Sequence, residues 1–276
     1  MEARMARTGR RLRRTSPAAF AAVVLALLAA SCSNATPDEP AEDAPVVIET
    51  PRADACRVLE PQDAAASSNE RDVVDCTEEH TARTFVVDEF PPAFADAAYD
   101  DTRLGEHVYG VCDEAFAKVV GGDESARLRS LLSWVWFRPQ ADAWEAGARW
   151  FRCDVVGGTD TAETYRPLPA DLDKILDTQP DEWMACVQGP QVAGAPRVPC
   201  SEPHNWRAAT TIKLGKAGDD YPGDRLAEVR TRDFCRTSIS AWLDYPDSYE
   251  FGFTWFGQAE WEVGNRRSIC WAKIDR

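Results

Sequence analysis

The chain has 276 residues, a formal net charge of −15 and nine cysteines. An acidic surface repels phosphate backbones and anionic lipid head groups, which excludes nucleic acid as a partner and leaves basic or cationic partners open. The length accommodates two small domains behind an N-terminal segment and leaves no room for a third.

Residues 1–31 have the order of an export signal. Arginines come first, an apolar run follows at Phe20–Leu28, and small residues end the segment at Ala29–Ser31. The apolar run is too short to span a bilayer, and no later segment approaches the roughly 20 apolar residues that a span requires. We therefore predict a signal peptide at 1–31 and no transmembrane helix.

Ala30, Ser31 and Cys32 resemble the lipobox of bacterial lipoproteins. The resemblance implies that Cys32 is acylated, becomes the new N-terminus and holds the protein at the outer face of the cell membrane through its buried methylenes. Ordinary signal cleavage without a lipid is the alternative. Loss of six arginines and one glutamate with residues 1–31 takes the formal charge to about −20.

Residues 32–52 predict a tether. Ser33–Pro51 is rich in Pro, Ala and acidic residues and short of large apolar ones, so it cannot bury enough surface to fold alone. We interpret its acidic run, Asp38–Asp43, as a solvated part of the tether and not as a docking motif.

The eight remaining cysteines form two sets of four in matching order. The gap between the second and third cysteine is 36 residues in one set and 35 in the other. The sets are Cys56, Cys76, Cys112 and Cys153, followed by Cys186, Cys200, Cys235 and Cys270. In an exported chain an even set of this kind predicts disulfides.

A motif ahead of each fourth cysteine shows that the chain is an internal duplication. Trp144-Glu-x-Gly-x-Arg149-x-x-x-Cys153 recurs residue for residue as Trp261-Glu-x-Gly-x-Arg266-x-x-x-Cys270. The two copies of the motif therefore mark equivalent positions of one repeated unit. We predict repeat 1 at 53–158, a linker at 159–181 with one short helix at the end of its stretch 167–176, and repeat 2 at 182–276.

Four cysteines per repeat allow three pairings in each, and copies should share one. The first two cysteines of a repeat flank a short connection suited to neighbouring strands, and the last two would tie a helix to a closing strand. The favoured pairs are Cys56–Cys76, Cys112–Cys153, Cys186–Cys200 and Cys235–Cys270.

Strand and helix patterns recur in the same order in both repeats. Alternating or β-prone runs predict strands at 81–87, 133–137 and 150–156, and at 208–214, 249–256 and 268–274. Apolar residues at helical spacing predict one main helix in each repeat. These residues are Leu104, Val108, Val111 and Phe116 in 101–120, and Leu226, Val229, Phe234 and Ile239 in 224–242. The fold class is α+β: two tandem disulfide-bonded repeats, each a mostly antiparallel sheet with one main helix.

Cys76-x-x-x-His80 and Cys200-x-x-x-His204 could indicate a metal site or a Cys/His nucleophile. A zinc site needs four convergent ligands, yet the chain has three histidines and no Cys-x-x-Cys. A nucleophile needs a free thiol, and the matched sets leave none. With no serine-nucleophile or phosphate-loop motif present, we predict no metal, no cofactor and no enzyme activity.

The duplicated Trp and Arg residues allow two interpretations. Exported aromatic side chains could stack on cell-wall glycan, or Trp144 and Trp261 could anchor two small cores, as their repeat position favours. His80, His204, Trp144, Trp261, Arg149 and Arg266 are the candidate binding residues.

Val198-Pro-Cys-Ser-Glu-Pro-His204, the later Tyr221-Pro-Gly, the helix cysteine and Trp261-x-x-Gly-x-Arg-x-x-x-Cys resemble the septum formation domain family of actinobacteria. Repeat 1 departs from the pattern at Asp75, Glu79 and 100–101, like a diverged copy. The resemblance implies an exported or tethered protein linked to septum formation, and it supplies no catalytic residues. We expect a non-catalytic lipoprotein that contacts an envelope or division protein; the alternative is a module that binds cell-wall glycan or a small ligand.

Overall fold

The computed structural model describes residues 48–159, 161–216, 218–262 and 264–274. The predicted signal peptide, Cys32 and most of the predicted tether lie outside this part. Within it, no helix is both long and apolar enough to cross a membrane.

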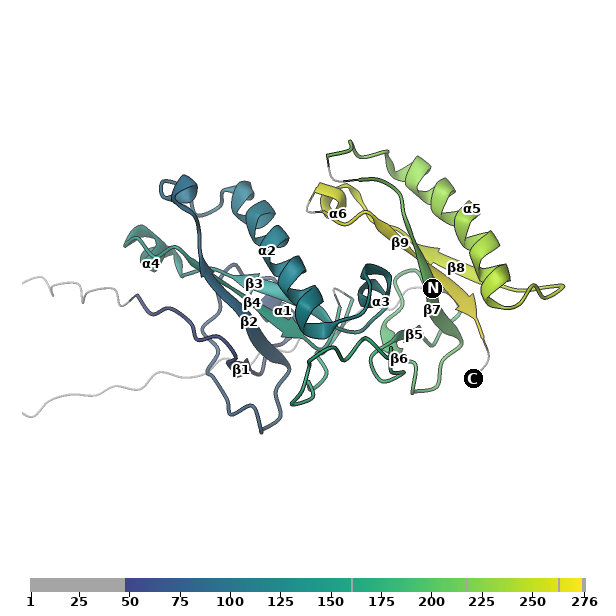
Figure 1. Ribbon diagram of the computed structural model, residues 1–276, viewed down its shortest axis with the longest axis horizontal. Coiled ribbons are helices and arrows are strands. Elements are labelled where there is room, and N and C mark those ends of the chain that lie inside the picture. Colours follow the sequence, from purple (N-terminus) through teal and green to yellow (C-terminus); the bar gives the residue numbers. More distant parts are fainter. Residues whose placement is uncertain (1–47, 160, 217, 263, 275–276) are drawn as a thin grey trace, which may run out of the picture. The chain divides into compact units, whose positions relative to one another are not determined.

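Repeat 1 forms a four-stranded antiparallel sheet in the order β1-β2-β4-β3, with α2 across one face (Figure 1). Its elements are β1 (Cys56–Arg57), α1 (Pro61–Ala64), β2 (Ala82–Glu89), the 3₁₀ helix η1 (Pro92–Phe94), α2 (Thr102–Val120), α3 (Glu124–Leu128), β3 (Ser133–Phe137), α4 (Ala141–Glu145) and β4 (Trp150–Val156).

Repeat 2 forms a five-stranded antiparallel sheet in the order β6-β5-β7-β9-β8, with α5 across one face (Figure 1). Its elements are β5 (Ala185–Val187), β6 (Arg197–Pro199), β7 (Trp206–Lys213), α5 (Asp224–Trp242), β8 (Phe251–Thr254), α6 (Gln258–Glu262) and β9 (Arg267–Lys273).

The two sheets have the same topology down to a local irregularity. The register between β2 and β4 shifts between Thr84 and Val86, and that between β7 and β9 shifts at the equivalent place, between Ala208 and Thr210. Only β6 is an addition, and an isolated bridge from Val74 to Cys56 occupies its place in repeat 1. The predicted α+β class with two tandem repeats is confirmed.

Each main helix buries a stripe of residues spaced by four, the spacing that returns to one helix face. The buried residues are Leu104, Val108, Cys112, Phe116 and Val120 in α2, and Ala227, Thr231, Cys235 and Ile239 in α5. With Cys112 and Cys235 placed in register, the two stripes coincide.

The predicted packing face of α5 was wrong at two positions. Leu226 is 41% exposed and Phe234 is 37% exposed, whereas Ala227 and Thr231 are fully buried. Apolar spacing alone favoured the larger side chains. The disulfide at Cys235 fixes which face meets the sheet, and the small Ala227 and Thr231 let α5 approach it.

The short helix predicted at the end of 167–176 was also wrong, because the segment forms turns. The backbone N–H of Lys174 donates to Val119 and that of Leu176 to Val120, at the end of α2. These donors are therefore unavailable for a helical ladder, and Lys174 adopts a φ of 52°. Leu168, Leu172 and Leu176 are buried in a cluster with the end of α2.

The glycine of the Trp-Glu-x-Gly motif has a positive φ in both repeats. Gly147 has a φ of 101° and Gly264 a φ of 118°, each just after a short helix, α4 or α6. L-residues rarely adopt this region, which explains why glycine stands at this position in both copies of the motif.

A second left-handed turn follows each main helix. After α2 it is formed by Gly121 and Gly122, with φ of 70° and 65°. After α5 it is formed by Asp244 and Tyr245, with φ of 63° and 57°. Repeat 2 therefore holds two residues with side chains in a conformation that disfavours them by about 1 kcal/mol or more.

The repeats differ most on the sheet face away from the main helix. Repeat 1 buries a polar cluster there: Arg152 Nε lies 3.1 Å from Asp154, Thr84 donates to Asp154 at 2.6 Å, and Arg57 donates to Thr84 at 2.8 Å. The counterparts in repeat 2 are apolar and belong to one core cluster: Val187, Ala208, Ile269 and Trp271.

The repeats contact each other through the segment around α3. The backbone N–H of Leu131 donates to Trp183, and that of Ala185 donates to Arg129. Leu131 is buried in the apolar cluster of the repeat 2 sheet. One repeat therefore completes the core of the other.

Candidate functional site

The structure joins the eight cysteines within repeats. The disulfides are Cys56–Cys76, Cys112–Cys153, Cys186–Cys200 and Cys235–Cys270, the four pairs favoured from the sequence. In each repeat one bond holds the main helix to the last strand in sequence, β4 or β9, and the other holds the first strand to the segment before the histidine.

His80 and His204 occupy equivalent positions, and both are 2% exposed. The Nδ1–H of each donates to the backbone carbonyl two residues earlier, on Glu78 at 2.9 Å and on Glu202 at 2.7 Å. Each ring therefore closes its own turn, and each Nε2 lies buried without a hydrogen-bond partner among the described residues.

The duplicated Trp and Arg side chains pack against each other. Trp144 and Trp261 are each 4% exposed, and the guanidinium carbons of Arg149 and Arg266 lie 4.1 Å and 4.0 Å from their ring centroids. Both Trp residues donate to a backbone carbonyl in the segment before the main helix: Ala97 for the first and Asp219 for the second.

The two arginines hold the same segments. Arg149 donates to the carbonyls of Ala95 and Trp144, and Arg266 to those of Lys216 and Trp261. The faces of the two Trp rings and the donors of the two Arg guanidinium groups are therefore engaged by contacts within the protein. The motif therefore joins the loop before the helix to the start of the last strand.

A groove of about 770 Å³ lies between the repeats, and sequence reasoning did not predict it. Repeat 1 contributes Tyr109, Asp113, Glu124, Arg127 and Trp134 to its lining. Repeat 2 contributes Thr254, Trp255, Glu260, Asn265 and Arg267. The volume lies in the range of small-molecule sites, and both aromatic and polar groups line it.

Contacts on the repeat 1 wall fix the orientation of an aromatic side chain. The Tyr109 ring lies 5.6 Å from the Trp134 ring, and the Asp113 carboxylate lies near the Trp134 indole. Burial raises the pKa of Asp113, and Glu124 adds to the effect. Burial and the carboxylates of Asp113 and Glu124 also raise the pKa of Tyr109 to about 12.

Glu124 joins the two walls. Its carboxylate lies 2.9 Å from Arg267 Nη2 and 3.2 Å from Lys213 Nζ, both on repeat 2. Burial by itself would raise the pKa of Glu124, but the hydrogen bonds and charges of Arg267 and Lys213 outweigh it and lower the pKa.

Trp255 stands at the end of a row of rings along the edge strand β8. Tyr249, Phe251, Phe253 and Trp255 follow one another at centroid distances of 5.7 to 6.4 Å, with planes 28° to 39° apart. Phe253 covers one side of Trp255, which is 40% exposed and lines the groove. The sequence predicted a strand here, but the alternation of aromatic and small residues could not show that Trp255 lines a groove shared with repeat 1.

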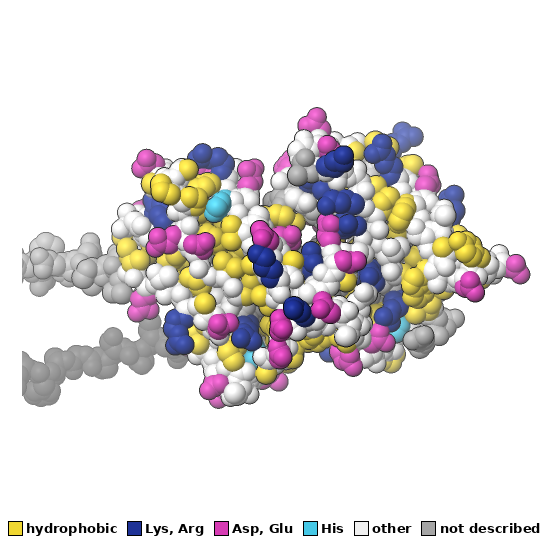
Figure 2. All heavy atoms as spheres, in the orientation of Figure 1, with side chains coloured by type: hydrophobic (Ala, Val, Ile, Leu, Met, Phe, Trp, Pro, Cys, Tyr) yellow, Lys and Arg dark blue, Asp and Glu magenta, His cyan; other side chains and the backbone are white. Residues whose placement is uncertain are grey.

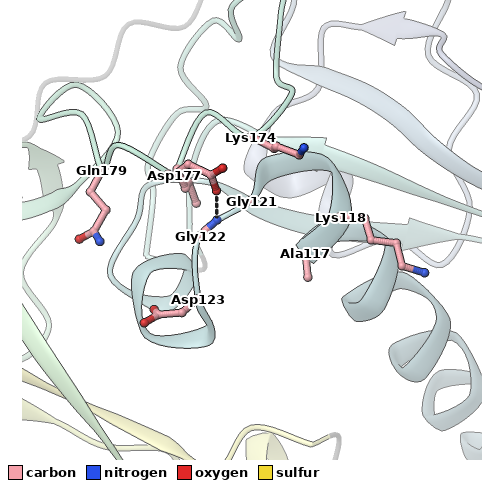
Figure 3. Close-up of a pocket in the computed structure, with 9 residues that line it drawn as sticks. Ala117, Lys118, Gly121, Gly122, Asp123, Lys174, Asp177 and Gln179 are labelled. Atoms are coloured by element: carbon pink, nitrogen blue, oxygen red, sulfur yellow. Dashed lines mark hydrogen bonds between the residues drawn. The ribbon is translucent and has the colours of Figure 1, made fainter.

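A second hollow, of about 760 Å³, lies at the end of α2. Figure 3 shows the Asp177 carboxylate accepting from the backbone N–H of Gly122 at 2.8 Å, while Lys118 and Lys174 extend away from this bond. The Asp177 carboxylate is therefore already engaged in a hydrogen bond that holds the linker to the end of α2.

The described residues contain no group of three or more His, Cys, Asp or Glu side chains arranged to hold a metal. Fold and sites together define a class of protein: duplicated, disulfide-bonded α+β domains with a groove between them.

The chain belongs to the septum formation family, whose sequence model matches residues 125–270, more than half of the chain. The match begins in α3 of repeat 1 and ends at Cys270. No curated protein and no solved structure matches the chain. Family membership indicates a role in cell division or the cell envelope, and with the four disulfides it indicates an extracytoplasmic protein.

Proposed function

We propose that this protein is a non-catalytic lipoprotein that acts outside the cytoplasm through contacts with a protein of the envelope or division septum. The observation that supports the proposal best is a set of exposed apolar side chains on and after α5. They are Leu226, Phe234, Trp242 and Tyr245, with exposures of 41%, 37%, 45% and 72%. Figure 2 shows hydrophobic side chains gathered around the C-terminal end of α5.

The comparison with repeat 1 shows that this surface is particular to α5. The counterparts of Leu226, Phe234, Trp242 and Tyr245 are Arg103, Val111, Val119 and Gly122. Val111 and Val119 are half-buried against core clusters, and the linker covers the end of α2. Several large apolar side chains exposed on and after one helix indicate an interaction surface, and aromatic residues carry much of the energy at protein interfaces.

The turn after α5 supports the same proposal. In repeat 1 the linker approaches Gly121 and Gly122 so closely that a side chain would collide with Asp177 or Leu176. Asp244 and Tyr245 take those positions in repeat 2, so no segment can cover α5 in the way the linker covers α2. Tyr245 is displayed instead, in a backbone conformation that costs stability, which is a pattern found at functional sites.

A photo-crosslinking amino acid placed at Phe234 or Tyr245 in living cells tests this surface. We expect both positions to crosslink to the same envelope or division protein. The matched control is Glu114, an exposed position on α2. Equal crosslinking from Glu114 to that protein, or none from either α5 position, would contradict the proposal.

The lipid anchor is a separate part of the proposal and rests on the sequence Ala30-Ser31-Cys32. Cys32→Ala should move the protein from the membrane fraction to the medium, or block its processing. An unchanged membrane fraction would remove the anchor from the proposed function and leave the α5 surface untouched.

The absence of catalysis is proposed from the arrangement of the candidate residues. His80, His204 and all eight cysteines of the repeats are engaged in turns or disulfides. Hydrolase, transferase and oxidoreductase substrates offered to the purified protein should show no turnover. Turnover that is lost in His80→Gln or His204→Gln would overturn this part.

A further inference from the structure

We propose that the groove between the repeats binds a neutral oligosaccharide segment, with one sugar ring stacked on Trp255. This site is distinct from the α5 surface, since none of Leu226, Phe234, Trp242 and Tyr245 lines the groove. The inference goes beyond the proposed protein contact and can fail or succeed independently of it.

The first argument is an aromatic face open to the groove. Phe253 lies against one side of Trp255, at 5.7 Å between centroids, and the indole remains 40% exposed. Of the four rings in this row, only Trp255 lines the groove. A large, flat and amphipathic ring suits the apolar C–H face of a sugar.

The second argument is the charge balance of the lining. Asp113, Glu124 and Glu260 are matched by Arg127, Arg197 and Arg267. Most of these charges already have protein partners: Glu124 pairs with Arg267, Arg127 donates to the Gly122 carbonyl, and Glu260 accepts from the Gly257 N–H. The groove thus has no excess of either sign to attract a strongly charged ligand, which favours a neutral one.

The third argument is a set of polar groups in the lining that retain hydrogen-bonding capacity for a ligand. Thr254 accepts from the Trp271 indole N–H, so its own hydroxyl proton can be donated. Asn265 accepts from the backbone N–H of Arg267 through Oδ1, which leaves its NH2 group for a ligand. Asp113 lines the groove, and its carboxylate oxygens can accept hydrogen bonds. Hydroxyl groups of a sugar can both donate and accept, and so match this set.

The walls are held in place before any ligand binds. The Tyr109 ring lies against Gly264, where any side chain would collide with it, and Asn265 follows directly. Tyr109 in turn packs against the ring of Trp134. Polar and aromatic groups from both repeats therefore stand in a fixed relation, as a preorganised site requires.

Isothermal titration of the purified full chain with a neutral N-acetylglucosamine tetrasaccharide, and separately with an arabinogalactan hydrolysate, tests the inference. We expect binding of at least one of them, weakened tenfold or more by Trp255→Ala. The matched control is Trp242→Ala, which removes an equally exposed tryptophan outside the groove and should leave the affinity unchanged. Asn265→Ala gives a second groove variant, expected to weaken binding several-fold.

Three results would overturn the inference. The first is no heat with either sugar at millimolar concentration. The second is equal weakening by Trp255→Ala and Trp242→Ala, both shown to be folded by circular dichroism. The third is that an uncharged glycine-serine peptide binds, that Trp255→Ala weakens this binding tenfold or more, and that neither sugar binds. The groove would then be a peptide site. Each leaves the crosslinking result at Phe234 and Tyr245 unaffected.

Discussion

Glu124 on α3 of repeat 1 lies 2.9 Å from Arg267 on β9 of repeat 2, and the same carboxylate reaches Lys213 on β7. One carboxylate therefore links two strands of the second sheet to the first repeat. Its exposed fraction of 40% places the pair near the surface, where such links stabilise modestly.

Glu124→Gln should lower the free energy of unfolding by roughly 0.5 to 1 kcal/mol at neutral pH, since the pair is partly screened by solvent. The folded state lowers the pKa of Glu124, so its contribution is present above the ordinary value of about 4.3 and is lost as pH falls through the folded pKa. Urea unfolding at pH 7 and near pH 3 measures the difference. The same wild-type to variant difference at both pH values would contradict the assignment.

Gly264→Ala should destabilise the protein by about 1 to 3 kcal/mol, because it adds a side chain at positive φ and drives it into Tyr109. Gly147→Ala is the matched control: its φ is also positive, but a Cβ there meets nothing within 4 Å. It should cost about 1 kcal/mol. Combining Gly264→Ala with Tyr109→Ala should remove the excess penalty, and strict additivity in urea unfolding would show that the two residues do not collide.

Asp154→Ala should cost about 3 to 5 kcal/mol, because it leaves Arg57 and Arg152 buried without their carboxylate. Asp233→Ala, which breaks the exposed pair with Arg232, should change stability little. A triple variant, Arg57→Val, Arg152→Ile and Asp154→Leu, removes the three charges of the cluster and leaves Thr84 as its polar side chain. It should be more stable than Asp154→Ala in thermal and urea unfolding; a less stable triple variant would contradict this account of the cluster.

Peptide mapping without reduction should recover four linked pairs, each confined to one repeat. Cys112–Cys153 closes a separation of 41 residues and Cys186–Cys200 one of 14. Each should contribute roughly 3 to 4 kcal/mol by restricting the unfolded chain, so Cys→Ser substitution of both members of a pair should lower the unfolding midpoint markedly. A peptide joining 56–153 to 186–270 would contradict the pairing.

The local sequence pattern was sufficient to predict an element where a residue's neighbours in sequence are also its neighbours in space. The strands Ser133–Phe137 and Trp150–Val156 match their predicted bounds, and so does the helix Asp224–Trp242. The duplication could be recognised because it copies whole elements, and the same copying makes both sheets share a register shift.

Packing between elements decided the rest. Leu226 and Phe234 have the right spacing for a core face, but the core around α5 is built on Ala227, Thr231 and Cys235. A helix in the linker was a sound expectation from 167–176, but its backbone donors are used by the end of α2. In both cases a partner distant in sequence competes with the local preference, and the distant partner wins.

The sequence by itself determined the two repeats, their α+β class, their main helices and the order of their cysteines. It did so because periodicity and duplication are written in consecutive residues. Only the tertiary structure decided that Trp144 and Trp261 are buried, that Phe234 and Tyr245 are exposed, and that Trp134 and Trp255 line one groove. Exposure and the meeting of two walls depend on how separate elements pack, and side chains far apart in the chain settle that packing together.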